Sequence, residues 1–334
     1  MGLNIRDIVP RKEISFESLN GKIIAVDAFN TLYQFLSSIR QYDGSSLQDS
    51  KGRITSHLSG LFYRNIALLS DEIKLIYVFD GKPPEQKAGT REKRINTKDS
   101  ARAKYDEAKK LGDYEAMRRY SQQLSVLTKE MIEESKELLN AMGIMVVQAP
   151  AEGEAQASFM AKYKDVYAVA SQDYDCLLFG APRLIQNLTL SRKRKTATGV
   201  ISVNPELIEL ERVLNSLQID HEQLISLGIL AGTDYNPGGI RGIGQKKALQ
   251  IVQQYKQPAI IFKQFPELDS GWQEIFQLFK KPDVLHDIEI KFPKIDKEKI
   301  KEILIEHEFS EERIDKQLEK LEEIKKTSAQ KRLF

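Results

Sequence analysis

Short apolar runs alternate with amphipathic stretches through the first 80 residues of the chain. Residues 23–26 and 75–79 form apolar runs of strand length, whereas residues 31–39 and 54–69 place their apolar side chains at helical spacing. The order strand, helix, strand predicts a βαβ unit. Because such units normally build a parallel sheet that helices cover on both faces, we expect an α/β fold with a mostly parallel central sheet.

The same alternation returns over residues 125–180. A helix is predicted through residues 131–139, and strands are predicted at residues 144–147 and 166–170. A further helix begins near Glu152, between these two strands. The second unit is expected to join the first in one sheet.

Farther along the chain, residues 184–190 and 199–203 are predicted to be two strands. Between them lies the basic turn Arg192-Lys193-Arg194-Lys195. These four cations either contact phosphate or form the solvated tip of a loop.

A charged insert separates the two halves of the predicted sheet. Gly81-Lys82-Pro83-Pro84 interrupts the strand pattern, and residues 87–110 then contain nine basic and four acidic residues. This segment has helical character but no broad apolar stripe, and such a helix is normally exposed to solvent. We expect it to project from the body, either as a functional arm or as a solvated charged helix.

Acidic residues follow the apolar runs, or the turns after them, at five widely separated places. Because the carboxyl ends of neighbouring parallel strands open onto one crevice, these side chains are expected to converge there. Any one of them could instead cap a helix or stabilise a loop, but two of the five places carry acids two residues apart. The seven candidates are Asp27, Asp80, Glu152, Glu154, Asp173, Asp175 and Asp234.

So many carboxylates in one crevice would repel one another and raise each other's pKa unless cations lay among them. Ligands that are all oxygen favour Mg²⁺ or Mn²⁺ over zinc or copper. Two such ions about 3.5 to 4 Å apart would clamp the attacking and leaving oxygens of a phosphodiester. The pattern therefore predicts metal-assisted phosphoester hydrolysis.

A second pattern is a glycine-rich turn that leads into a helix, Gly238-Gly239-Ile240-Arg241-Gly242-Ile243-Gly244-Gln245-Lys246-Lys247-Ala248. A tight glycine hairpin leaves backbone N–H groups available at the helix start, and Lys246 and Lys247 add positive charge there. The glycine spacing matches neither a dinucleotide fingerprint nor a Walker loop. The best match is a helix-hairpin-helix that grips nucleic-acid backbone, and glycines used only for tight packing are the alternative.

Composition sets the class of protein. The 334 residues, 41% of them hydrophobic, can form a large globular α/β protein, and a net charge of +2 does not indicate a partner by itself. No apolar run approaches the roughly 18 residues of a membrane span, and the N-terminus lacks the pattern of a secretory signal, so we expect an intracellular protein. One cysteine, Cys176, and four scattered histidines argue against an internal disulfide and against zinc.

Five motifs stand in order along nearly the whole chain: Val26-Asp27-Ala28, Tyr77-Val78-Phe79-Asp80-Gly81-Lys82-Pro83-Pro84, Ala149-Pro150-Ala151-Glu152-Gly153-Glu154-Ala155, Asp173-Tyr174-Asp175-Cys176-Leu177, and Gly232-Thr233-Asp234-Tyr235 followed by Gly239-Ile240-Arg241-Gly242-Ile243-Gly244. Together they resemble the flap endonuclease family of structure-specific 5′ nucleases. The resemblance covers both halves of the predicted sheet.

The resemblance implies a Mg²⁺-dependent endonuclease, with 5′–3′ exonuclease activity, that removes 5′ flaps at DNA junctions in replication and repair. It implies two Mg²⁺ ions, for which Mn²⁺ can substitute. Lys87 and Arg94, at the base of the insert, resemble residues that contact and polarise the scissile phosphate. The acids would divide into a first group of Asp27, Asp80, Glu152 and Glu154 and a second group of Asp173, Asp175 and Asp234.

The same resemblance implies further DNA contacts. The insert resembles a helical arch through which the flap passes, Tyr33 resembles an aromatic that stacks on an exposed base, and Arg40 and Arg64 resemble DNA-contacting arginines nearby. For Tyr33 and Arg64 the alternative is ordinary packing in an amphipathic helix. In the hairpin, the expected duplex contacts are Gly239, Ile240, Gly242, Gly244, Lys246 and Lys247, and the carbonyls of Gly239, Ile240 and Ile243 suit a K⁺ ion.

The resemblance also suggests how one nuclease domain, residues 1–334, is organised: an N-terminal half (1–81), an arch insert (82–135), an internal half (136–235), a helix-hairpin-helix (236–260), a C-terminal helical region (261–326) and a tail (327–334). Family members commonly end in a sliding-clamp box, of which Gln330, Leu333 and Phe334 supply only the beginning. The sequence therefore leaves open whether this chain binds a sliding clamp. We expect a monomer, located in the cytoplasm near the nucleoid in an archaeon or in the nucleus in a eukaryote.

Two other classes of protein share part of the pattern. A haloacid dehalogenase-type phosphatase also has an aspartate after its first strand, but it uses a second aspartate two residues later, where this chain has Phe29. A non-catalytic DNA-junction-binding protein could carry the same hairpin and charged arm. Such a protein has no use for seven convergent acids.

Overall fold

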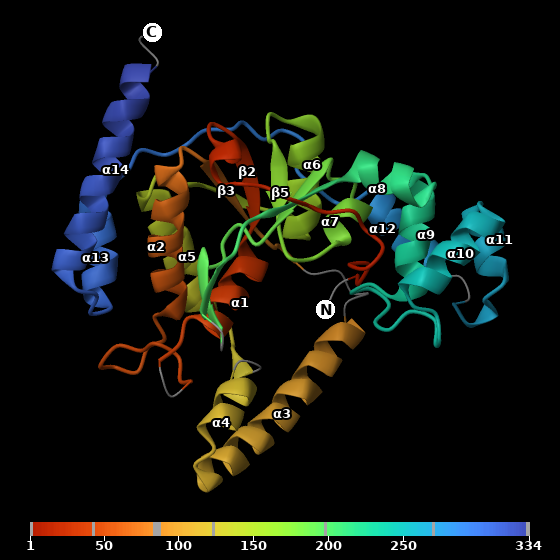
Figure 1. The fold of residues 1–334 in the computed structure, drawn as a ribbon, viewed down its shortest axis with the longest axis horizontal. Coiled ribbons are helices and arrows are strands. Elements are labelled where there is room, and N and C mark those ends of the chain that lie inside the picture. The colour runs from red at the N-terminus through yellow and green to blue at the C-terminus, as the bar shows by residue number, and fades with distance from the viewer. Residues whose placement is uncertain are drawn as a thin grey trace.

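In the computed structural model, a seven-stranded sheet lies at the centre of the molecule with helices on both sides (Figure 1). The structure describes residues 3–41, 44–82, 88–121, 124–196, 199–268 and 271–331. The strands of this sheet are β1 (Lys12–Glu13), β2 (Ile23–Asp27), β3 (Lys74–Phe79), β4 (Met145–Gln148), β5 (Ala168–Ala170), β6 (Arg183–Gln186) and β9 (Glu206–Glu209).

The strand order is β1-β9-β6-β5-β2-β3-β4. The five strands β6, β5, β2, β3 and β4 run parallel, and β9 pairs antiparallel with β6 and with β1. From β2 the chain builds outward to β3 and β4, and it then returns to build β5 and β6 on the other side. The β2–β5 pair is therefore a topological switch point, where open α/β sheets form a crevice. The predicted mostly parallel sheet is confirmed.

Helices cover both faces of the sheet and enclose two apolar cores. One face carries α1 (Ala28–Ser38), α2 (Ser56–Ser70), α5 (Lys129–Ala141), α13 (Lys297–Glu306) and α14 (Glu311–Lys331). The other face carries α6 (Gly153–Tyr163), α7 (Asp175–Leu178), α8 (Leu210–Leu217), α9 (His221–Ala231), α10 (Gln245–Tyr255), α11 (Pro258–Lys263) and α12 (Gly271–Lys280).

Burial on both faces explains the continuous apolar runs. In β3, Leu75, Tyr77 and Phe79 belong to one core, and Ile76 and Val78 belong to the other. Successive side chains of a strand point to opposite faces, so a strand between two cores needs an apolar residue at every position. A run of this kind is what made the central strands predictable.

The prediction for the basic turn is wrong. Lys193–Thr196 form a strand of their own, β7, which pairs antiparallel with β8 (Gly199–Ser202) in a separate two-stranded sheet. The predicted strand at residues 184–190 ends at Gln186 as β6 and belongs to the central sheet. A two-stranded ribbon at the surface buries little of either face, so it tolerates the basic residues that suggested a turn.

The charged insert extends from the body as two helices, α3 (Ala88–Leu111) and α4 (Tyr114–Ser121) (Figure 1). The turn between them contains Gly112 at φ +66°. Ala101 and Ala108 are buried, and the Lys104 amine lies 5.9 Å from the centre of the Tyr120 ring. Helix α5, whose first residues fall in the predicted insert, packs on α2 in the body.

Among the described residues, the remaining elements are the short 3₁₀ helices η1 (Glu17–Leu19) and η4 (Pro266–Leu268). Within the described ranges, the structure contains no helix of the length and apolarity that a membrane crossing needs.

Candidate active site at the carboxyl ends of the parallel strands

Asp27 ends β2 and caps α1, so it lies at the carboxyl edge of the sheet beside the switch point. Its Oδ1 accepts a hydrogen bond from the backbone N–H of Asn30 at 3.0 Å. Its Oδ2 accepts a hydrogen bond from the Ser171 hydroxyl at 3.1 Å. Only 4% of the residue is exposed. The carboxylate is thus fixed in place and largely removed from water.

Asp80 follows β3 and holds the start of α6. Its Oδ1 accepts a hydrogen bond from the backbone N–H of Gly153 at 2.7 Å. A Cβ atom on Gly153 would lie 2.8 Å from that oxygen and 3.0 Å from the Val78 carbonyl, so only glycine fits this approach. Because Gly153 stands between Glu152 and Glu154, this contact brings both glutamates to the same edge.

Ser171, in the turn after β5, links acids from three elements. Its hydroxyl contacts Glu154 Oε1 at 3.1 Å as well as Asp27, and it accepts a hydrogen bond from the Asp173 backbone N–H at 3.1 Å. The Asn30 side-chain amide donates to Asp173 Oδ2 at 3.5 Å. A hydroxyl can donate its one proton to only one of two carboxylates at a time. The two acids therefore compete for the Ser171 proton.

The other acids lie nearby on α7 and around the end of α9. Asp175 Oδ1 accepts a hydrogen bond from the Leu3 backbone N–H at 3.0 Å, which ties the N-terminal segment to the site. The Tyr235 hydroxyl donates to Glu152 Oε2 at 2.8 Å. Asp234 precedes Tyr235 in the turn after α9 and is 7% exposed. That turn therefore reaches the edge where Glu152 lies.

The electrostatics of the buried groups also indicate a concentration of negative charge. Burial, followed by repulsion from Asp80 and a smaller contribution from Asp173, raises the pKa of Asp27 to about 7. Burial raises the pKa of the Cys176 thiol, and charges on four of the acids, Glu154 first, raise it further. Burial and then the charge of Glu152 raise the pKa of Tyr235. Its phenol therefore stays protonated as a donor.

The donor set suits hard divalent cations. All seven candidates supply carboxylate oxygens, which Mg²⁺ and Mn²⁺ prefer, and a cation would relieve the repulsion that raises the pKa of Asp27. Among the described residues, no three His, Cys, Asp or Glu side chains are already arranged as the ligands of one ion. The argument for a divalent cation therefore rests on the oxygen ligands that the acids supply and on their mutual repulsion.

The other predicted residues of the body lie on α1, just beyond its end, and on α2. Tyr33 on α1 is 40% exposed, as an aromatic that stacks on a base must be. Arg40 donates to the carbonyls of Ser37 and Gly44 and, at 2.8 Å, to the Ser125 hydroxyl, so it also braces the chain after α4. Arg64 is half-buried on α2.

Some predicted residues lie outside what the structure describes. Lys87, Leu333 and Phe334 fall outside the described residues. Arg94 lies in α3 and Gln330 in α14, but neither side chain belongs to the described set.

The glycine hairpin combines tight packing with an open helix start. Gly239 has φ +55°, and a Cβ atom there would lie 2.4 Å from the Leu230 carbonyl, so this glycine packs against the end of α9. At Gly242 and Gly244 a Cβ atom would meet nothing within 4 Å. Gly244 caps α10 without a side-chain hydrogen bond, and the lysines that follow it are exposed. The segment therefore combines a closely packed glycine with an exposed, basic helix start.

Family models match both parts of the chain that build the central sheet. A family model described as the XPG N-terminal domain matches residues 4–101, which include Asp27 and Asp80. A second, the XPG I-region, matches residues 143–234, which include the other five acids. The flap endonuclease 1 of Hyperthermus butylicus is 51% identical over 96% of this chain and 94% of its own length. The flap endonuclease 1 of Pyrococcus abyssi is 52% identical over 100% of this chain and 97% of its own length.

The chain belongs to the flap endonuclease 1 family. Membership of the flap endonuclease 1 family confirms the prediction of a metal-dependent, structure-specific 5′-flap endonuclease of DNA replication and repair. The two alternatives, a haloacid dehalogenase-type phosphatase and a non-catalytic junction-binding protein, are therefore rejected.

Solved structures share the fold. The flap endonuclease-1 from Methanococcus jannaschii matches with a TM-score of 0.78 at 44% identity, covering 97% of this chain and 98% of that chain. The catalytic core of Rad2, solved in complex with a DNA substrate, matches with a TM-score of 0.71 at 23% identity, covering 96% of this chain and 100% of that chain.

The sequence prediction missed four residues that organise the candidate site. Ser171, Asn30, Tyr235 and Gly153 hold the acids by the contacts above. Each lies within three positions of a predicted acid, which is the one signal that could have found them. Their roles depend on contacts between elements far apart in the chain, and the local pattern contains no such information.

Proposed function

We propose that this member of the flap endonuclease 1 family holds two Mg²⁺ ions, or Mn²⁺ in their place, and hydrolyses the phosphodiester at the base of a 5′ flap. When bound, the ions supply positive charge at the scissile phosphate and a water molecule of lowered pKa. The first group of ligands would be Asp27, Asp80, Glu152 and Glu154, and the second Asp173, Asp175 and Asp234. The same site is proposed to carry the 5′–3′ exonuclease activity.

The observation that carries this proposal is the shared hydrogen bonding of acids from separate elements. Ser171 contacts both Asp27 and Glu154, and Asp80 holds the backbone of Gly153 between Glu152 and Glu154. Burial raises the pKa of Asp27 to about 7, and the repulsion from Asp80 and Asp173 contributes to this rise. A divalent cation is the simplest partner that relieves it, since it attracts all of these carboxylates at once.

The surrounding residues would orient the ligands. The Tyr235 phenol fixes one oxygen of Glu152, because burial keeps the phenol a proton donor. Asn30 and Ser171 limit the rotation of Asp173 and Asp27. Partners of this kind, beyond the metal ligands themselves, typically affect metal affinity or activity 10- to 100-fold.

The DNA contacts are proposed from exposed features on three sides of the crevice. Tyr33 would stack on a base at the junction, and the helices α3 and α4 would guide the flap, with Lys87 and Arg94 polarising the scissile phosphate. The open start of α10, with Lys246 and Lys247, would hold the phosphates of the downstream duplex. Carbonyls of Gly239, Ile240 and Ile243 would bind K⁺ there, although the Ile240 carbonyl already accepts a hydrogen bond from the Ile243 N–H at 3.0 Å.

The decisive assay is cleavage of a duplex that carries a 5′-labelled flap, with Mg²⁺ and with a chelator. We expect Asp173→Ala to abolish cleavage while keeping most DNA binding. The matched control is Asp165→Ala, because Asp165 is an exposed acid just before β5, at the opposite end of that strand. Cleavage that persists in the chelator, or an active Asp173→Ala enzyme, would contradict the proposal.

The remaining parts of the proposal concern assembly, location, the division of the chain and a clamp contact. We infer a monomer in the cytoplasm near the DNA, as expected of an archaeal enzyme, and light scattering of the purified protein tests the first point. The division into an arch insert, a helix-hairpin-helix and a C-terminal helical region remains a prediction. A contact with a sliding clamp through Gln330, Leu333 and Phe334 also remains a prediction. A pull-down with an archaeal sliding clamp tests it.

A further inference from the structure

Gln186 is a buried glutamine at the end of β6, and its side chain reaches the turn that follows β5. The two strands run parallel with Ala170 opposite Ile185, so Gln186 lies beside Ser171, where that turn begins. Leu184 belongs to the core on the side of α6 and α7, and the alternation of a strand places Gln186 on the same face. Only 2% of Gln186 is exposed. A polar side chain buried so deeply needs hydrogen-bond partners, and the turn supplies them.

The Gln186 side chain contacts the residues on both sides of Asp173. Its Nε2 donates to the Gln172 carbonyl at 2.9 Å, and its Oε1 accepts a hydrogen bond from the Tyr174 hydroxyl at 3.4 Å. Burial raises the pKa of Tyr174, so its phenol remains a proton donor. A glutamine can make both contacts because its amide group carries a donor and an acceptor. Gln186 therefore holds Asp173 through its two neighbours.

The peptide between Gln172 and Asp173 is fixed at both of its polar ends. Its carbonyl accepts the hydrogen bond from Gln186, and its N–H, which belongs to Asp173, donates to the Ser171 hydroxyl at 3.1 Å. The preceding N–H, that of Gln172, donates to the side-chain oxygen of Asn30 at 3.4 Å. The orientation of this peptide decides where the Asp173 carboxylate points. Gln186 supplies the contact that comes from the neighbouring strand.

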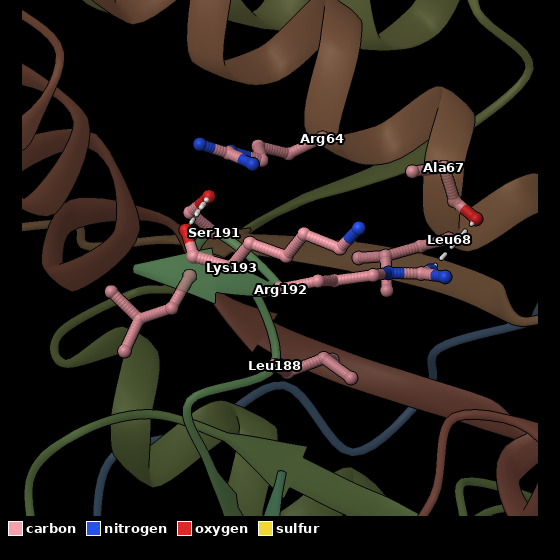
Figure 2. Close-up of a pocket in the computed structure, with 8 residues that line it drawn as sticks. Arg64, Ala67, Leu68, Leu188, Ser191, Arg192 and Lys193 are labelled. Atoms are coloured by element: carbon pink, nitrogen blue, oxygen red, sulfur yellow. Dashed lines mark hydrogen bonds between the residues drawn. The ribbon is translucent and has the colours of Figure 1, made fainter. Parts of the chain in front are cut away.

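Gln186 itself lies on a fixed base. It ends a strand that is paired on both sides, with β5 and with β9, and the chain after it is tied to two helices. Thr189 donates to the Gln34 side chain on α1 at 2.7 Å, and the Arg192 guanidinium donates to the Ala67 carbonyl on α2 at 3.1 Å. Figure 2 shows the second anchor in the wall of a cationic pocket, which is lined in part by Arg64, Arg192 and Lys193. A side chain on such a base can hold a turn in one position.

We propose that Gln186 is a positioning residue for the metal site, and that it holds the turn of Asp173 and Asp175 ready for the cations. The inference rests on the proposed function, and it assigns to that site a residue that acts through the turn. Carboxylates gathered at one edge repel one another when no cation lies among them, and this repulsion pushes the turn outward. A turn held at both neighbours of Asp173 resists that push. Less ordering is then left to occur when the metal binds.

The first test measures metal binding without DNA, so it does not depend on cleavage. The metal-free full chain is titrated with Mn²⁺, and the free ion is measured by electron paramagnetic resonance. Gln186→Met keeps the length of the side chain and removes its amide donor and acceptor. We expect the Mn²⁺ dissociation constant to rise about tenfold, the low end of the effect that is typical of residues that hold metal ligands.

The matched control is Gln156→Met. Gln156 is also buried, and its side chain accepts a hydrogen bond from the Leu285 N–H at 2.7 Å and donates to the Leu285 carbonyl at 3.1 Å. The control thus loses the same chemical groups as Gln186→Met, but these groups hold a different segment. We expect wild-type Mn²⁺ affinity in the control, even where its free energy of unfolding falls as far.

Amide hydrogen exchange in a chelator locates the effect in the chain. We expect peptides that span residues 171–178 to exchange about three- to tenfold faster in Gln186→Met than in the wild type, and at the wild-type rate in Gln156→Met. Tyr174→Phe removes only the longer of the two contacts, so its effect should be smaller. If Gln186→Met does not fold, Gln186→Glu takes its place, because it keeps the acceptor and loses the donor to Gln172.

Single-turnover cleavage at saturating flap DNA separates positioning from general damage. We expect Gln186→Met to need about tenfold more Mg²⁺ for its half-maximal rate, and to regain most of the wild-type rate when Mg²⁺ is saturating. Its affinity for flap DNA in a chelator should equal that of the wild type.

Three results would overturn the proposal. Wild-type Mn²⁺ affinity in a folded Gln186→Met protein would show that the metal site does not need this glutamine. An equal loss of affinity in Gln156→Met would indicate a general effect of stability, and unchanged exchange over residues 171–178 would show that the turn keeps its shape without Gln186. Absence of flap cleavage by the wild type would instead contradict the proposed function, and the Mn²⁺ and exchange measurements distinguish that failure because neither needs cleavage.

Discussion

Replacement of Asp27 by asparagine tests whether acid repulsion creates the need for cations. Asparagine has the same shape, and its side-chain oxygen can still accept the Asn30 N–H while its amide donates to Ser171. The substitution therefore removes the charge and keeps the local hydrogen bonds. Any change in pH dependence then reports on ionisation and not on packing.

The structure determines the sign and size of the effect. Burial and the neighbouring acids raise the pKa of Asp27 from 3.8 to about 7, so the folded protein keeps a proton that the unfolded chain releases. This contribution to stability is fully present below pH 3.8 and is lost as the pH rises through about 7. The difference in pKa corresponds to about 4 kcal/mol of unfolding free energy.

The assay is guanidinium unfolding in a chelator at several pH values between about 4 and 8. We expect the wild-type protein to lose about 4 kcal/mol more than Asp27→Asn across this range. Added Mg²⁺ at pH 8 should restore most of this loss in the wild type and much less in the variant. The exposed control Asp165→Asn should follow the wild-type profile.

The reasoning is refuted if Asp27→Asn and the wild type lose stability in parallel as the pH rises. Parallel curves would mean that Asp27 is ionised at ordinary pH and that the cluster is neutralised without metal. A variant that is already less stable than the wild type at pH 4 would report damage to packing, which circular dichroism at pH 4 detects.

Three further substitutions test other parts of the structure. Gly239→Ala should lower the free energy of unfolding by more than Gly242→Ala does. Both glycines have positive φ, but only at Gly239 would a Cβ atom meet backbone, at 2.4 Å. Equal losses in urea titrations would show that the hairpin relaxes around the added methyl group. Glu134→Ala should cost about 1–3 kcal/mol, because it leaves the buried His57 without its hydrogen-bond partner at 3.2 Å, and an unchanged urea midpoint would argue against that contact. Tyr235→Phe should raise the Mg²⁺ concentration for half-maximal cleavage about tenfold and leave the affinity for flap DNA unchanged. An unchanged Mg²⁺ requirement would argue that Tyr235 does not orient Glu152.

Edge strands and central strands differed in how well the sequence predicted them. β2 and β3 were located to within one residue, because both faces are buried and every position is apolar. β1 and β9 were missed, since Lys12–Glu13 and Glu206–Glu209 lie at or near the sheet edge and include charged residues. β7 was mistaken for a turn because its charges suggested solvent and gave no sign of pairing.

In the candidate site, too, some features were predictable from the sequence and others were not. That acids would gather at one edge was predictable, because parallel strands place their carboxyl ends together and acids follow four of the sheet's neighbouring strand ends. The contact between Ser171 and Asp27 was not predictable, because it depends on the register that pairs Val26 with Ala170. One residue of slip in that register would move the hydroxyl away from the carboxylate.

By itself, the sequence determined the fold class and predicted a metal site and its acids, since apolar periodicity and side-chain chemistry are local properties of the chain. Only the tertiary structure decided how those acids are held and where a further cationic pocket forms. The Ser171 bridge joins residues 144 positions apart, and Arg192 reaches Asp71 across 121 positions. Contacts of that range follow from strand order and helix packing, which no local pattern of residues specifies.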